Sequence, residues 1–111
     1  MKIKFEKIKE EIVIIAEDSR YTPLELLGDK WKLENIQSIK QGVQQAIDDE
    51  SMDDFTIESL SGCIWIFPDH KKAGVYRNFP QNDTDNKSLL NLTLPEVVEF
   101  LTLMEDFLKN K

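Results

Sequence analysis

The chain has 111 residues, of which 41% are hydrophobic and 32% are charged. This length and composition fit one compact domain spanning residues 1–111 and exclude both a second core of ordinary size and wholesale disorder. Fourteen basic and 21 acidic residues give a net charge of -7, which argues against direct binding of nucleic acid or of an anionic membrane. One cysteine and one histidine exclude a disulfide scaffold and a His/Cys zinc site.

No export signal is predicted in the amino-terminal residues, and no membrane span is predicted in the sequence. Residues 1–7 contain lysines but no following apolar stretch with a small-residue cleavage site, so no secretory signal is predicted. The longest apolar run, residues 12–16, is far shorter than the roughly 20 residues needed to span a bilayer. We therefore expect a cytoplasmic protein with no membrane partner.

Residues 2–17 are rich in β-branched side chains, and their density towards the end favours a strand over about residues 11–17. Helical spacing fits some of the same positions, namely Phe5, Ile8, Ile12 and Ile15. One strand, a hairpin and a partly helical segment therefore all stay open for this part of the chain.

Two helices are expected in the next thirty or so residues. Thr22 and Glu25 form a capping-box pattern around Pro23, and Gly28 offers a stop, so a short helix is predicted over about residues 23–27. Beyond Trp31, apolar residues recur at steps of three and four over residues 33–47, with polar residues on the opposite face. This spacing predicts a long amphipathic helix.

Residues 55–79 carry the signals of a sheet. The run 64–67 is apolar at every position, as in a central strand buried on both faces, and Pro68 ends it. This pattern places Trp65 in the core. Residues 74–79 are expected to return as its hairpin partner, residues 55–60 to form a preceding strand, and residues 80–87 to form a loop.

A second capping box, from Thr93 to Glu96, opens a carboxyl-terminal helix whose apolar arc is wide enough to contact both a sheet and another helix. The expected fold class is α+β: a two-layer single domain in which an antiparallel sheet of three to five strands packs against a long central helix and a C-terminal helix.

Catalytic groups are scarce. Cys63 and His70 are the one nucleophile–base pair that the composition allows, but seven residues of extended chain would separate them by roughly 20 Å. A core cysteine and an exposed turn histidine are the simpler interpretation. We therefore predict no enzymatic activity, no cofactor and no metal.

The strongest surface feature is an acidic segment that follows the long helix: Asp48, Asp49, Glu50, Asp53 and Asp54. It lacks the spacing of an EF-hand loop. Residues 31–60 hold two basic and seven acidic residues, a net charge of -5, so most of the chain's negative charge lies in this third. Either the segment is an ordinary solvated loop, or it docks a cationic protein and speeds the encounter with it.

Further interface candidates are aromatic or lie beside an aromatic residue. Trp31, between two lysines, fits either helix packing or a binding anchor. Tyr76 and Arg77 are of residue types enriched at interfaces and would form a second candidate surface on a strand face.

Several segments carry a family resemblance. They are Tyr21-Thr22-Pro23, Leu27-Gly28, Trp31, the helix over residues 36–47, Cys63-Ile64-Trp65-Ile66-Phe67-Pro68, and the helix opening over residues 94–100. In these segments and in general layout the chain resembles small bacterial immunity proteins, nearest those of contact-dependent growth inhibition systems that neutralise ribonuclease toxins. The resemblance implies tight binding of a cognate toxin domain without chemistry of its own.

The predicted function is therefore that of an immunity protein whose acidic surface binds a basic, nucleic-acid-cleaving toxin. A nuclease needs a cationic groove for phosphates, and clustered carboxylates can occupy the same electrostatic field. The alternatives are an adaptor or chaperone for a secretion-system client and, less favoured, a small carboxylate-dependent enzyme.

Overall fold

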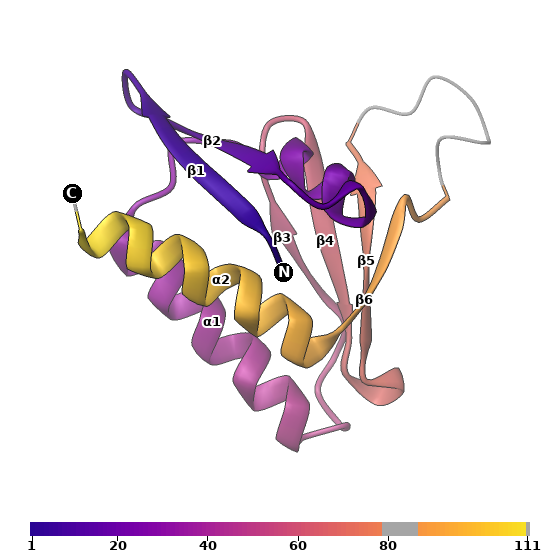
Figure 1. Ribbon diagram of the computed structural model, residues 1–111. Coiled ribbons are helices and arrows are strands. Elements are labelled where there is room, and N and C mark those ends of the chain that lie inside the picture. The colour runs from indigo at the N-terminus through magenta and orange to yellow at the C-terminus, as the bar shows by residue number, and fades with distance from the viewer. Residues whose placement is uncertain (79–86, 111) are drawn as a thin grey trace.

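Two antiparallel sheets and two long helices make up the part of the chain that the computed structural model describes, residues 1–78 and 87–110 (Figure 1). The predicted α+β class is confirmed. In chain order the elements are β1 (Ile3–Ile8), β2 (Glu11–Ala16), the 3-10 helix η1 (Ser19–Leu27), α1 (Leu33–Asp48), β3 (Phe55–Glu58), β4 (Gly62–Phe67), the 3-10 turn η2 (Pro68–His70), β5 (Lys72–Arg77), β6 (Leu90–Thr93) and α2 (Leu94–Lys109).

The amino-terminal segment is a hairpin. β1 and β2 pair antiparallel with Phe5 opposite Ile14, and Lys9 makes the turn with a positive φ of 59°. Ile12 and Ile14 of β2 are buried, while their neighbours face outward in part. Buried and more exposed residues alternate along β2, as they do in a strand. Of the three possibilities left open for residues 2–17, the hairpin is therefore correct.

The short helix differs from the one predicted. It begins earlier, at Asp18, whose carboxylate accepts a hydrogen bond from the Arg20 amide at 3.0 Å. Thr22 is exposed and caps nothing, and Glu25 accepts from the Ala16 amide at 2.8 Å instead of closing a box. The capping-box prediction at Thr22 was wrong because Asp18, four residues earlier, provides the cap.

The two long helices follow the predictions closely and lie side by side (Figure 1). The box at the start of α2 is present: the Thr93 hydroxyl accepts from the Glu96 amide at 3.2 Å, and the Glu96 carboxylate accepts from the Thr93 amide at 3.0 Å. Across the helix pair, Lys40 Nζ donates to Glu105 Oε1 at 2.8 Å. None of the described helices is long and apolar enough to cross a membrane.

The larger sheet has the strand order β3-β4-β5-β6, all antiparallel. Ile57, Ile64, Val75 and Leu90 lie opposite one another in turn across the four strands, and all are buried. The sequence did not predict β6, because its four residues contain only two apolar–polar repeats and are followed directly by α2. Of the predicted loop over residues 80–87, residues 80–86 lie outside the described part of the chain.

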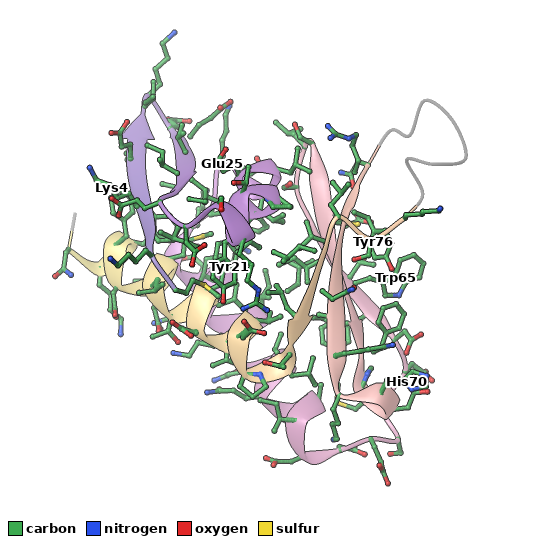
Figure 2. All side chains as sticks on the ribbon, turned by 45° about the vertical axis from the view of Figure 1, so that its right-hand side comes forward. Lys4, Tyr21, Glu25, Trp65, His70 and Tyr76 are labelled. Atoms are coloured by element: carbon green, nitrogen blue, oxygen red, sulfur yellow. The ribbon has the colours of Figure 1, made fainter. Side chains whose placement is uncertain are left out.

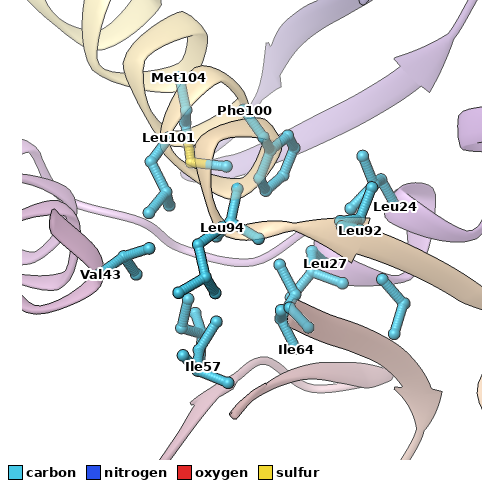
Figure 3. Packing of buried hydrophobic residues seen from close by; sticks show 14 of the residues in the cluster. Leu24, Leu27, Val43, Ile57, Ile64, Leu92, Leu94, Phe100, Leu101 and Met104 are labelled. Carbon is cyan, nitrogen blue, oxygen red and sulfur yellow. The ribbon is translucent and has the colours of Figure 1, made fainter. Parts of the chain in front are cut away.

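The core lies between this face of the sheet and the helices (Figure 3). Leu94, Leu101 and Met104 of α2 meet Val43 of α1 and Ile64 of β4 there, each at most 1% exposed. Trp65 does not join them. Its side chain points to the other face and is 43% exposed, so the prediction of a strand buried on both faces was wrong. The helices cover one face of the sheet alone.

Candidate functional site

The open face of the four-stranded sheet is the most distinctive surface of the molecule. Side chains alternate between the two faces of a strand, so the β4 residues that alternate with the buried Ile64 and Ile66 project away from the helices. Figure 2 shows Trp65 and Tyr76 on this side of the sheet, with His70 at one end of it. The residues on this face are Thr56, Glu58, Cys63, Trp65, Phe67, Lys72, Gly74, Tyr76, Asn91 and Thr93.

Three rings on this face form an aromatic cluster: Trp65, Phe67 and Tyr76. The Trp65 and Phe67 rings stack with centroids 5.9 Å apart and an angle of 10° between planes. Tyr76 meets Trp65 edge-on, with centroids 6.0 Å apart and an angle of 71°. Rings that are already packed against one another lose little freedom when a partner covers them, so the cluster is suited to binding.

The absence of a side chain at Gly74 leaves room for the Tyr76 ring. A Cβ atom at this position would lie 2.9 Å from Tyr76 Cε2 and 2.9 Å from the Ser88 hydroxyl. The tyrosine ring therefore lies across the bare backbone of β5, where any side chain would displace it.

Beside the rings the surface is hollowed. An open depression of about 360 Å³ lies between the aromatic cluster and η2. Phe67, Tyr76, Asp54, Asp69 and Lys72 are among the residues that line it. We call this depression the hollow. His70 lies at its edge, with Nε2 3.5 Å from Asp69 Oδ2.

The acidic segment runs up to this hollow. Lys71 Nζ donates to the carbonyls of Ala46 at 3.0 Å and Ile47 at 2.7 Å, which satisfies the carboxyl-terminal end of α1 and ties it to the corner after η2. The segment therefore leaves α1 close to the hollow, and its last carboxylate, Asp54, is part of the hollow's lining.

Within the segment all five carboxylates are exposed. Hydrogen bonds from the Ser51 hydroxyl and amide lower the pKa of Asp49, because they favour its charged form. The segment is therefore a loop with some internal order.

The other predicted interface residues lie elsewhere. Trp31 packs partly buried against the core, and its Nε1 donates to the Leu27 carbonyl at 2.6 Å. Arg77 borders a separate depression with Pro23 and Leu26, on the side of the sheet that faces η1. The structure thus brings Tyr76 and Asp54 together and sets Trp31 and Arg77 apart from them.

The sequence did not predict that Trp65 and Phe67 lie on the open face of the sheet or that Asp69 lines the hollow. Alternate residues of the apolar run 64–67 point to opposite faces of the sheet. The run itself does not indicate which of the two faces the helices cover. Gly74, two residues before Tyr76 and directly opposite Trp65 in the register, was the one available signal, because glycine in a strand often marks a site where another group lies close to the backbone.

Cys63 is also on this face, partly buried. Burial, together with the nearby Glu58 carboxylate, raises the pKa of the Cys63 thiol, which keeps the thiol protonated and a poor nucleophile. In residues 1–78 and 87–110 no three His, Cys, Asp or Glu side chains are grouped to hold a metal ion. The chemistry that this face offers is stacking, hydrogen bonding and charge attraction.

The chain matches no protein-family model, no curated protein and no solved structure.

Proposed function

We propose that the chain is a cytoplasmic immunity protein that binds a cognate toxin domain with a cationic surface, a nuclease, and neutralises it without catalysis. The observation that carries the proposal is the exposed aromatic cluster on an uncovered sheet face, bordered by carboxylates. Trp65 is 43% exposed and stacked on Phe67. Tryptophan and tyrosine are the residues that most often dominate protein interfaces.

The charge on this face supports a protein partner and argues against nucleic acid. Aromatic sheets can also stack unpaired bases, but such surfaces carry lysines and arginines for the phosphates. Here, among the described residues, Lys72 is the one lysine or arginine on the open face or in the lining of the hollow, whereas Glu58, Asp69 and Asp54 of the acidic segment are carboxylates. These carboxylates repel phosphates and attract the basic groove of an enzyme that cleaves nucleic acid.

The two features would serve different steps of binding. Exposed carboxylates of the acidic segment act at a distance and raise the association rate. The aromatic cluster acts after contact, because burying rings slows dissociation. Together they fit an inhibitor that must capture its toxin quickly and hold it.

The same surface would serve an adaptor that holds a secretion-system client, the main alternative. Its client would be carried without being inactivated. Inhibition of the partner's activity therefore separates the two functions.

The test first asks whether a gene beside this one encodes a large secreted toxin, and then uses the carboxyl-terminal domain of that protein. We expect the purified chain to abolish cleavage of RNA or DNA by that domain at equimolar concentration and to protect cells that express it. The variant Trp65→Ala should protect poorly, and Leu60→Ala, which truncates an exposed apolar side chain at the turn before β4, should protect fully. A neighbouring gene that encodes no toxin, or a bound toxin domain that stays fully active, would refute the proposal.

A further inference from the structure

The hollow next to the aromatic cluster has a composition of its own. Its lining combines two aromatic residues, Phe67 and Tyr76, with two acidic residues, Asp54 and Asp69. We propose that the hollow is a pocket for one arginine side chain of the partner protein. The inference deepens the proposed function, on which it rests for the identity of the partner.

The lining matches the two properties of a guanidinium group. Its flat face stacks on aromatic rings, and its edge donates hydrogen bonds in a fork that suits carboxylate oxygens. Phe67 and Tyr76 supply the rings, and Asp54 and Asp69 supply the oxygens. A lysine ammonium lacks the flat face, so arginine is the better fit of the two cations.

The dimensions of the hollow suit a side chain. Its volume of about 360 Å³ is at the lower end of the range of ligand sites, about 300–1,000 Å³. Gly74 also lines the hollow, and its missing side chain leaves room for the Tyr76 ring at the hollow's edge. A folded element of a partner would not enter this space, but the end of one long side chain would.

Lys72 is the one lysine or arginine that lines the hollow, and its charge opposes a second cation. No ion pair of Lys72 is found within residues 1–78 and 87–110. With Asp54 and Asp69 charged and His70 uncharged, the lining carries a net negative charge, so an arginine is attracted overall. Removing the Lys72 charge should strengthen that attraction.

The pocket can be tested without the toxin. The probe is N-acetyl-arginine amide, titrated into the isotopically labelled protein and followed by NMR at the backbone amides. We expect saturable shifts at Asp69, Gly74 and Tyr76 with a dissociation constant on the order of 1 mM, as a few weak contacts would give. The citrulline analogue, which has the same shape without the charge, should give no saturable shifts at these amides, and the lysine amide should bind more weakly than arginine.

Variants then assign the effect to the lining. Asp69→Asn should weaken binding of the arginine amide about threefold, and Lys72→Gln should strengthen it about threefold, which are the sizes typical of one exposed charge. Damage to the fold cannot produce such a gain. Tyr76→Phe should keep the affinity and Tyr76→Leu should reduce it, while Asp106→Asn, on the exposed side of α2, should change nothing.

Three results would each contradict the proposed arginine pocket. No saturable shift at the hollow, equal binding of citrulline, or indifference to both Asp69→Asn and Lys72→Gln would each do so. A titration with single-stranded oligouridylate is the remaining arm: if it shifted these amides and competed with arginine, the face would be a nucleic-acid surface and the proposal would fail. Arginine binding in a protein that does not inhibit the toxin would refute the immunity function alone, whereas inhibition without arginine binding would refute the pocket alone.

Discussion

Single buried side chains determine how firmly the two layers hold together, and Leu101 illustrates this. It lies in α2, 1% exposed, within the cluster that joins the helices to the sheet. Leu101→Ala should lower the free energy of unfolding by about 2 to 5 kcal/mol, because it leaves a cavity in a packed core. The matched control is Leu89→Ala, an exposed leucine, which should cost less than about 0.5 kcal/mol. Urea denaturation compares the two, and an unchanged midpoint for Leu101→Ala would contradict the packing of α2.

Glu105 makes stability depend on pH. It is buried between the helices, 8% exposed, and the hydrogen bond from Lys40 lowers the pKa of its carboxyl. A carboxyl whose pKa is lower in the folded state stabilises the fold above the ordinary glutamate pKa of about 4.3, and this contribution is lost as the pH falls through the folded value.

We therefore expect Glu105→Gln to be less stable than the wild type at neutral pH, and the gap to close progressively below about pH 4.3. Thermal unfolding at a series of pH values measures it. Glu10→Gln, at the exposed hairpin turn, should track the wild type throughout. A gap that stayed constant down to low pH would show that the ion pair with Lys40 does not stabilise the fold.

The exposure of Trp65 could not be predicted from its neighbours in the sequence. Its neighbours Ile64 and Ile66 were correctly predicted as buried, since they are apolar residues in an apolar run. Whether the opposite face of the strand is also covered depends on where the helices dock, which is a property of the whole chain. The aromatic cluster could therefore be recognised only in three dimensions.

At the scale of elements, two similar sequences behave differently. Thr22 and Thr93 each precede a glutamate by three residues, with a proline between them, but only Thr93 caps a helix. Thr93→Ala should lower the free energy of unfolding by about 1 kcal/mol, within a range of about 0.5 to 2. Thr22→Ala should change it by less than about 0.5 kcal/mol. Equal effects in chemical denaturation would contradict the assignment of Asp18 as the cap of η1.

Helices were easier to predict than strands for a physical reason. The spacing that marks α1 is local, because residues three and four apart share a helix face. A strand such as β6 is defined by its partner: Val75 and Leu90 are fifteen residues apart in the sequence and lie opposite each other in the sheet. Four residues of modest alternation carry too little local information to reveal that pairing.

On the scale of the whole molecule, the uneven charge predicts a kinetic effect. Replacing the five acidic residues together by Asn or Gln should slow association with the toxin domain and flatten its dependence on salt, because exposed charges act mainly on the association rate. Stability should hardly change, since all five side chains are exposed. Stopped-flow mixing at low and high salt measures the association rate. An unaltered association rate at both salt concentrations would mean that the segment is an ordinary solvated loop.

The arrangement of charge could be predicted from the sequence, but the binding face could not. The acidic segment was recognised as an exposed loop, and its connection to the sheet through Asp54 and the hollow depends on the corner fixed by Lys71. Trp31 and Tyr76 were both candidate interface residues in the sequence. Only the fold places one against the core and the other in the aromatic cluster.

The most direct test of the central proposal, that the aromatic sheet face holds the partner, is the dissociation rate of the complex with the toxin domain. Trp65→Ala should speed dissociation at least about tenfold, as the loss of a dominant aromatic anchor does, while its denaturation midpoint stays close to that of the wild type. Leu60→Ala, which truncates a 64% exposed leucine away from the rings, should dissociate at the wild-type rate. If Trp65→Ala also dissociated at the wild-type rate, the partner would bind elsewhere and the aromatic cluster would not be the binding surface.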